Sequence, residues 1–221
     1  MIKLGGYKMA SLFEQKFGIK EVADVAFYNQ GDVKYDSTTG KVVATDGTAT
    51  PVLEFTTLKT SGLEFTGETT EARGGKGNAV LMSWDHSREA TLTLEDALLS
   101  SKSLATMLSN KPATLVGDNT VISIDANGFP GTYTVVGKTY ARGTDGKDHL
   151  LTFLIFKAKV SAEANFEMSA DGDPSTLNMT LKVLRCTKDA IDIKMGASDG
   201  DMVKMIIDDN TGEGTPAISF P

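Results

Sequence analysis

Residues 150–186 read LLTFLIFKAKVSAEANFEMSADGDPSTLNMTLKVLRC, and this stretch decides the fold class. Apolar residues dominate its first part, and in its last part they alternate with polar residues, as they do in β-strands. Between the two parts, residues 171–174 read DGDP, a sequence typical of a tight turn. The stretch therefore predicts a pair of long strands, around 150–168 and 176–186, in a β-sheet.

Patterns elsewhere predict more strands and two helices. Further strands are expected at residues 90–94, 121–124, 132–136 and 202–207. The principal helix is expected over about 96–109, where Leu98, Leu104 and Met107 recur at helical spacing on one side. A short amphipathic helix is expected over about 9–17, just before a glycine that is suited to end it.

Many strands with one principal helix predict a mainly β (α+β) fold, a β-sandwich or open barrel flanked by that helix. The chain shows no internal repeat, heptad pattern or charge block that would separate a second domain. Residues 1–221 are therefore expected to form one domain. A tail rich in Gly, Thr and Pro, about 209–221, is expected to be flexible.

Charge and composition exclude several classes of protein. The formal net charge of −7 argues against a protein that grips nucleic acid through its phosphates, which requires a basic surface. No apolar run approaches the ~18 residues of a membrane span, and residues 1–13 lack the features of a secretory signal. Folding in a cytoplasm is therefore expected. Cys186 is the only cysteine, so no internal disulfide can form, and a buried apolar role is expected for it.

No residue pattern indicates catalysis, a metal or a cofactor. Residues 74–77 read GGKG but lack the first glycine and the final Ser/Thr of a phosphate-binding loop. Residues 85–87 read DHS, yet adjacent positions do not by themselves make a catalytic triad. Asp171 and Asp173 lack the following glutamate of a calcium-binding loop. The sequence therefore predicts no enzyme, no catalytic residue, no metal and no cofactor.

A longer stretch carries a family resemblance. Residues 71–89 read EARGGKGNAVLMSWDHSRE and continue into LEDALLS at 94–100. The segments FGI at 17–19, VADV at 22–25, LEF at 53–55 and LK at 58–59 occur before it in the order of the same family. Together they resemble the major tail proteins, or tail tube proteins, of tailed bacteriophages that infect mainly Gram-positive bacteria. The resemblance covers roughly the first half of the chain.

The resemblance implies a structural virion protein with a tail-tube type β-sandwich. Such subunits form six-membered rings that stack into a tube, and strands from all subunits join into one inner barrel through which viral DNA passes. The implied partners are further copies of the chain and the tape-measure, tail-terminator and baseplate or tail-tip proteins. The implied location is the virion tail, assembled in the host cytoplasm.

Three groups of residues are candidates for roles in such a tube. The glycine-rich segment is a candidate inter-subunit loop and comprises Arg73, Gly74, Gly75, Lys76, Gly77 and Asn78. Trp84 and Arg88 are candidate structural anchors, with Trp84 buried between neighbouring strands at 79–85 and 88–94. Glu64, Glu68 and Glu71 are candidates for an acidic lumen, since acidic walls keep DNA mobile.

Two kinds of alternative remain open at this point. One is another virion component, such as a tail terminator, a head decoration protein or the tube of a contractile injection system. The other is a β-sandwich module that binds carbohydrate. A carbohydrate-binding module requires exposed aromatic side chains, and the chain has a single tryptophan and 7% aromatic residues.

Overall fold

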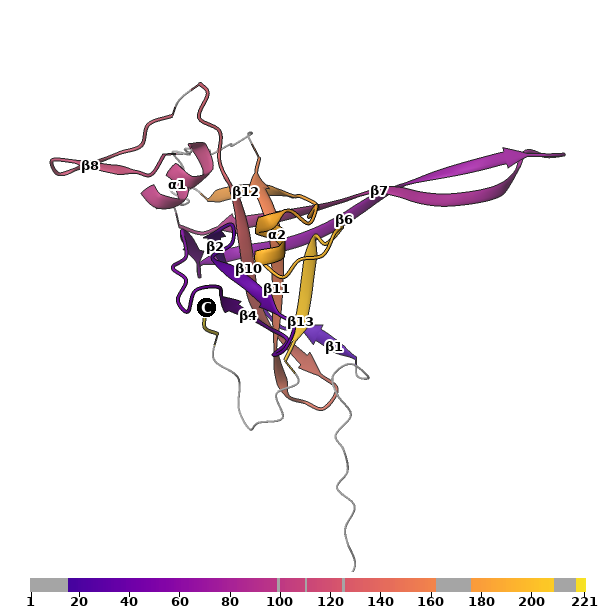
Figure 1. The fold of residues 1–221 in the computed structure, drawn as a ribbon, viewed down its shortest axis with the longest axis horizontal. Helices are drawn as coiled ribbons and strands as arrows, with labels where there is room; N and C mark the ends of the chain where they lie inside the picture. The colour runs from indigo at the N-terminus through magenta and orange to yellow at the C-terminus, as the bar shows by residue number, and fades with distance from the viewer. Residues whose placement is uncertain (1–15, 99, 110, 125, 162–175, 209–217) are drawn as a thin grey trace, which may run out of the picture.

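A computed structural model describes residues 16–98, 100–109, 111–124, 126–161, 176–208 and 218–221 (Figure 1). The strands are β1 (Phe17–Ile19), β2 (Asp24–Asn29), β3 (Val33–Asp36), β4 (Lys41–Ala44), β5 (Leu53–Phe55), β6 (Leu58–Gly74), β7 (Ala79–Asp96), β8 (Thr114–Val116), β9 (Asn119–Val121), β10 (Thr132–Gly143), β11 (Asp148–Val160), β12 (Leu177–Val183) and β13 (Val203–Ile207). The helices are α1 (Ser101–Leu108) and α2 (Ala190–Lys194). The mainly β fold class is confirmed. Neither of these described helices is long and apolar enough to cross a membrane.

One antiparallel sheet organises the chain, in the order β5-β2-β10-β11-β12-β7-β6. β1 also pairs with β10, and β13 also pairs with β11. β3 with β4 and β8 with β9 form separate hairpins. The sheet curls: the Ala23 N–H before β2 donates a hydrogen bond to Ser61 Oγ in β6, at 3.2 Å. This contact brings β6, at one end of the sheet, close to β2 near the other end.

The central strands are buried on both faces because two apolar clusters lie on either side of them. Alternate residues of β2, such as Val25 and Phe27, pack with Leu92 and Leu94 of β7 and with Met107 of α1. The intervening β2 residues, with those of β10 and β11, pack under the β3–β4 hairpin and the chain around α2. A strand covered on both faces is apolar at successive positions. This explains the continuous apolar run at 150–156.

Cys186 lies in this second cluster and is fully buried, as the sequence predicts. Burial, together with the nearby Asp192 carboxylate, raises the pKa of the Cys186 thiol to about 12.

The predicted pair of long C-terminal strands lies only partly within the described residues. There β11 and β12 pair antiparallel at three positions, where Ala158 meets Val183 and Val160 meets Leu181, up to the point where the described part of the chain stops. Most of β11 pairs with β10, and its middle also pairs with β13. Alternation identifies strands but does not choose their partners, which depend on how the whole sheet packs. The DGDP segment lies outside the described residues.

The other predicted strands differ in extent. Those expected at 90–94 and 132–136 lie within β7 and β10, and the one expected at 202–207 is present from Val203 as β13. The one expected at 121–124 is wrong beyond Val121, where β9 ends.

The principal helix is shorter than the sequence predicts, since α1 covers Ser101–Leu108 rather than 96–109. β7 continues as a paired strand through Asp96, whose carboxylate accepts a hydrogen bond from Thr57 Oγ1 at 2.6 Å. Leu98 therefore lies before the helix and is 61% exposed, instead of on its apolar side.

Local capping sets where the helix begins. Ser100 Oγ accepts a hydrogen bond from the Ser103 N–H at 2.9 Å, and Ser103 Oγ accepts one from the Ser100 N–H at 3.0 Å. This reciprocal pair is a capping box. Met107 is buried on the apolar side of α1, as expected.

Residues 9–15 of the helix expected at 9–17 lie outside the described residues. Its last residue, Phe17, begins β1 and pairs with Gly143 of β10, so the helix does not extend that far. Backbone pairing with a sheet edge overrides the local helical spacing here.

The expected C-terminal tail is described only at residues 218–221. There Lys138 Nζ donates a hydrogen bond to the Ser219 carbonyl, and the Phe220 ring packs against the second cluster. Lys138 Nζ lies 5.5 Å from the centre of that ring. The last residues therefore contact the core.

Candidate functional site

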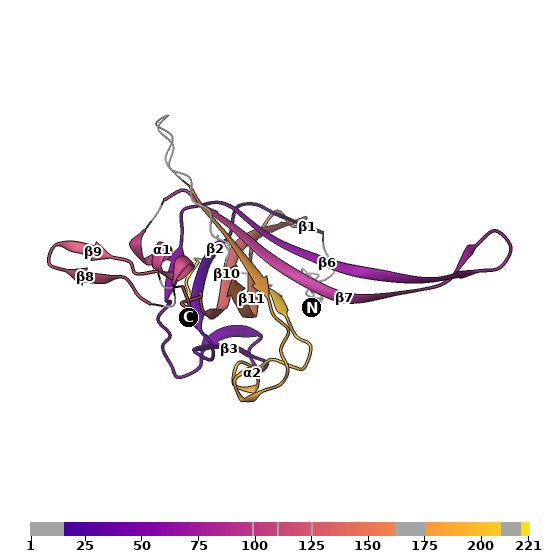
Figure 2. The ribbon, with the colours of Figure 1, turned by 90° about the horizontal axis from the view of Figure 1, so that it is seen from above.

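The most unusual feature of the fold is a long hairpin, made of β6 and β7, that extends away from the body (Figures 1 and 2). β12 pairs with β7 only from Ala90 to Asp96. From Glu89 toward the tip of the hairpin, no third strand among the described residues pairs with it. We call residues 66–89 the arm. Its side chains are predominantly exposed. An isolated two-stranded hairpin is only marginally stable in water, and beyond the sheet the arm has only the pairing of its own two strands among the described residues.

The arm ends in a tight turn that is shorter than the predicted loop. Arg73 and Gly74 belong to β6, and only residues 75–78 form the turn. Gly75 and Gly77 have φ of 79° and 89°, in the left-handed region that favours glycine. The predicted inter-subunit loop is thus part strand and part turn, and the structure brings its six residues together at the end of the arm.

A bulge divides the arm into two parts. Thr66 pairs with Glu89 and Glu68 pairs with His86, so β7 carries one extra residue there. Ser87 in this bulge has φ of 54°. A bulge of this kind increases the local twist of a hairpin, and Figure 2 shows the arm twisting along its length.

The DHS motif lies at this bulge and does not form a triad. His86 Nε2 lies 2.6 Å from Thr70 Oγ1, and His86 Nδ1 lies 2.9 Å from Ser87 Oγ. Asp85 instead accepts a hydrogen bond from Thr69 Oγ1 at 2.6 Å. The contacts of His86 with Thr70 and of Asp85 with Thr69 link the two strands of the arm.

The outer part of the arm carries an apolar strip. Its members are Val80, Leu81, Met82 and Trp84, which are 44%, 65%, 65% and 47% exposed. Met82 and Trp84 lie on one face of the arm, opposite Ala72 and Thr70, and Val80 lies on the other face, opposite Arg73. Exposed apolar side chains that gather in this way mark interaction surfaces. Val80, Leu81 and Met82 were not among the residues predicted to have a role, although the run AVLM at 79–82 lacks the polar alternation of a strand that faces water on one side.

The structure corrects the expected environment of Trp84. Residues 79–85 and 88–94 are not neighbouring strands but parts of the single strand β7. Trp84 pairs with Thr70 on the arm and lies outside both apolar clusters. Arg88 lies nearer the body, with its guanidinium carbon 5.7 Å from the centre of the Phe65 ring.

The three candidate lumen glutamates do not share one face. Side chains alternate along β6, so Glu64 and Glu68 lie on one face and Glu71 on the other. Glu71 pairs with Arg73, with 2.6 Å between the carboxylate and the guanidinium. Glu89, opposite Thr66, lies on the same face as Glu64 and forms an ion pair with Lys182 of β12 at 3.3 Å.

The second histidine, His149, lies inside the body, within hydrogen-bonding distance of two neighbouring groups. His149 is buried, with Nε2 3.1 Å from Asp145 Oδ2 and Nδ1 3.2 Å from the Asp208 carbonyl. Across the described ranges, no group of three His, Cys, Asp or Glu side chains could hold a metal ion.

Comparison with known proteins identifies the family. The model of the YomU/Tube protein family matches residues 17–111 and 117–195, which is most of the chain. None of the curated proteins matches it. The chain belongs to the YomU/Tube protein family, in agreement with the resemblance to phage tail tube proteins. It is a structural protein of a phage tail tube.

Proposed function

We propose that copies of this chain assemble into six-membered rings, that the rings stack into a tail tube, and that viral DNA passes through the tube without specific binding. The family supports the tube, and the six-fold ring is what the resemblance to tail tube proteins implies. The chain has no proposed catalytic role.

The observation that carries this proposal is the apolar strip on the unsupported arm. Covering a large apolar side chain completely contributes about 1.5–3 kcal/mol. Because the strip residues are about half exposed, a partner that covers them would contribute about 1 kcal/mol for each. Contact with further copies of the chain would supply this stabilisation.

The open edges of the arm support the same proposal. β6 is the last strand of the sheet, and the outer part of β7 has β6 as its only strand partner among the described residues. Exposed strand edges are prone to pair with strands of other chains. Pairing of arms around a ring would form a closed barrel, which has no free edges.

The charge of the chain supports a channel for DNA. We propose that Glu64, Glu68 and Glu89 line the lumen where β6 and β7 leave the body, on the body side of the apolar strip, which a further copy covers. DNA carries about one negative charge per 1.7 Å of helix axis, and acidic walls would keep it from adhering. Glu71, on the opposite face, is no longer proposed as a lumen residue. The tape-measure, tail-terminator and baseplate proteins remain proposed partners in the virion.

Electron microscopy of the purified protein tests the assembly. We expect wild-type chains to form tubes with six-fold symmetry at high concentration or with a tail initiator. The double variant Met82→Ser/Trp84→Ser should stay monomeric, with the melting temperature of the wild-type monomer, because the strip packs on no core in the monomer. Ile193→Ser is the matched control, since Ile193 is 59% exposed on α2 at a distance from the arm.

Two results would contradict the proposal. One is a wild-type protein that stays monomeric even with its tail partners, and the other is a closed assembly that does not stack. A double variant that melts well below the wild type would show instead that the strip supports the monomer.

A further inference from the structure

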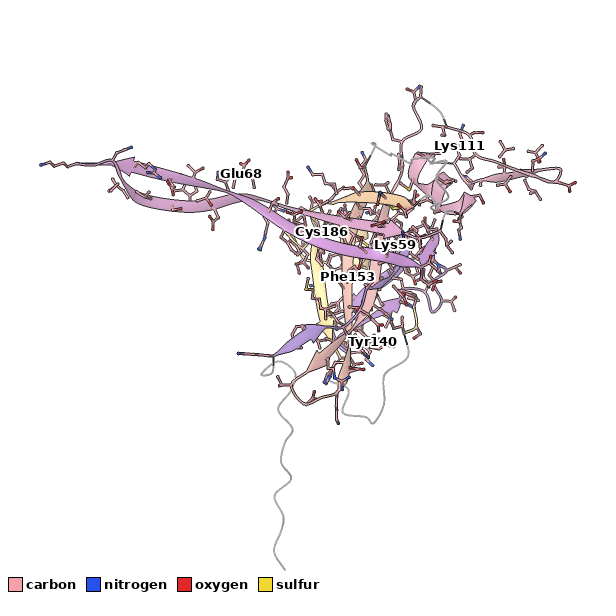
Figure 3. The ribbon with its side chains drawn as sticks, turned by 180° about the vertical axis from the view of Figure 1, so that it is seen from behind. Lys59, Glu68, Lys111, Tyr140, Phe153 and Cys186 are labelled. Carbon is pink, nitrogen blue, oxygen red and sulfur yellow. The ribbon has the colours of Figure 1, made fainter. Side chains whose placement is uncertain are left out.

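One buried histidine joins two segments that are far apart in the chain. His149 Nε2 lies 3.1 Å from Asp145 Oδ2, in the turn between β10 and β11, and Nδ1 lies 3.2 Å from the Asp208 carbonyl oxygen, just after β13. Only 4% of His149 is exposed. Tyr140, which pairs with Leu150 next to His149, marks this end of the body in Figure 3, away from the arm.

Both partners of the His149 ring are hydrogen-bond acceptors. A backbone carbonyl and an ionised carboxylate have no hydrogen to donate. The Lys147 N–H donates to Asp145 Oδ1 at 3.0 Å, and this bond, with the one from His149, holds the pKa of the Asp145 carboxyl below its ordinary value. A neutral imidazole has a single N–H and can donate to only one of the two partners. The geometry therefore requires a proton on both ring nitrogens.

The charges around the ring make Asp145 its counter-ion. Lys147, in the same turn, acts on Asp145 as well. The residue opposite His149 on β10 is Ala141, which carries no charge. Two further carboxylates at this end of the body are paired with cations. These pairs are Asp148 with Lys20 and Arg142, at 2.9 and 3.3 Å, and Asp208 with Lys41, at 3.8 Å.

We infer that His149 is a proton-dependent clasp between the β10–β11 turn and the end of β13. While the ring holds both protons, it donates to both acceptors and the clasp is closed. When one proton leaves, the remaining N–H stays with the Asp145 carboxylate, because hydrogen bonds to charged groups are the stronger ones. Nδ1 then turns a lone pair toward the Asp208 carbonyl oxygen, and the clasp opens. The clasp is therefore complete in acid and is lost as the pH rises.

The end of β13 that the clasp holds is also the wall of a pocket. Ile206, Ile207 and Asp208 line this pocket of about 380 Å³ together with Lys138 and Ser219. Lys138 Nζ donates a hydrogen bond to the Ser219 carbonyl there. Burial lowers the pKa of Lys138, but an amine donates in either form, so this contact does not need the second proton. Opening the clasp loosens the wall against which the last residues of the chain rest.

Hydrogen exchange of the Asp208 amide tests the clasp. This N–H donates to the Leu150 carbonyl at 2.9 Å, so it loses protection when the end of β13 detaches. In the dilute full-length chain, we expect its protection factor, corrected for the intrinsic rate at each pH, to fall on the order of tenfold between about pH 6 and about pH 9. The Phe156 amide, which donates to the Met202 carbonyl at the other end of β13, should show no such step.

Two amide variants distinguish a clasp from an ordinary buried contact. In Asp145→Asn, the new amide oxygen can accept from the Lys147 N–H while its nitrogen donates to Nε2. A neutral His149 then keeps its N–H for the Asp208 carbonyl, so the Asp208 amide should stay protected up to about pH 9. Asp118→Asn, the same change in the β8–β9 turn, is the matched control and should keep the wild-type step. Intact masses check that neither new amide has hydrolysed.

The nitrogen-15 spectrum of the wild-type ring decides the case without any variant. Two protonated nitrogens at about pH 6, and loss of the Nδ1 proton over the same range as the step in Asp208 protection, support the clasp. A single N–H at about pH 6, or a step that does not follow the ring proton, would overturn the inference. The same holds if Asp145→Asn keeps the wild-type step while its Phe156 amide remains protected. The measurement uses unassembled chains, so a negative result leaves the proposed tube intact.

Discussion

Substitution of Gly196 by alanine tests how the second apolar cluster is closed. Gly196 follows α2 with φ of 73°, and a Cβ added there would lie 2.4 Å from the Tyr35 carbonyl oxygen. The Tyr35 N–H also donates a hydrogen bond to the Met195 carbonyl at 2.9 Å. The Tyr35 backbone is therefore held against this corner, and Gly196→Ala must displace it.

The chain provides a control for the backbone contribution. Gly200 has φ of 89°, but nothing lies within 4 Å of the Cβ that would be added there. Left-handed backbone costs an L-residue roughly 1–2 kcal/mol, and the lower entropy of the unfolded alanine chain offsets about 0.4–1 kcal/mol of this. We therefore expect Gly200→Ala to lower the free energy of unfolding by about 1 kcal/mol.

Gly196→Ala adds a steric cost to the same backbone cost. Forcing extra atoms into a packed site typically costs about 1–3 kcal/mol, so we expect a total near 3 kcal/mol. For a domain of this size, that corresponds to a fall in melting temperature of about 6–12 °C. Urea and thermal unfolding of both variants, monitored by circular dichroism, measure the difference. Equal losses in Gly196→Ala and Gly200→Ala would refute the close packing of Tyr35 on α2.

Two further predictions concern charge. Tubes that carry Glu64→Lys/Glu68→Lys should bind short linear DNA at low salt, so that the DNA sediments with the tubes. Wild-type tubes and tubes with Glu71→Lys, the control on the opposite face, should leave the DNA in the supernatant. Equal DNA binding by all three would exclude the acidic lumen. Burial raises the pKa of the Asp192 carboxyl, but the Lys157 ammonium, 2.6 Å away, and the hydrogen bond from the Thr187 N–H together outweigh burial and lower that pKa. The stability from this pair is therefore complete above the unfolded pKa, about pH 3.9, and is lost as the pH falls through the lower folded value. Asp192→Asn should lower the melting temperature at pH 7 and reduce the loss of melting temperature that the wild type shows as the pH falls. An unchanged loss in acid would contradict a stabilising role of the Asp192–Lys157 ion pair.

Local patterns predicted much of the secondary structure. Alternation located the strands around 90–94, 132–136 and 202–207, because side chains alternate between the faces of a strand whatever its partner. Helical spacing located α1, although its start depended on Asp96 remaining in the sheet. The single cysteine in an apolar run predicted the buried position of Cys186.

The sequence also indicated the family. A run of nineteen residues at 71–89 resembled tail tube proteins, and the family match covers the same region. Those residues form the end of β6 and the outer part of β7. The glycine-rich segment looked like a flexible loop, because glycine is unfavourable within strands. Cross-strand pairing nevertheless extends β6 to Gly74 and leaves only four residues in the turn.

Only the tertiary structure decided which surfaces remain uncovered. From sequence alone, Trp84 was expected to be buried, since a large aromatic residue in a strand usually packs in a core. Its exposure follows from β12 ending beside Ala90, so that no third strand of the described chain pairs with the arm beyond that point. Likewise, strand parity places Glu64 and Glu71 on opposite faces of β6. The sequence determines which segments can be strands, whereas the contacts between distant segments determine which of their faces meet solvent and therefore which can bind another subunit.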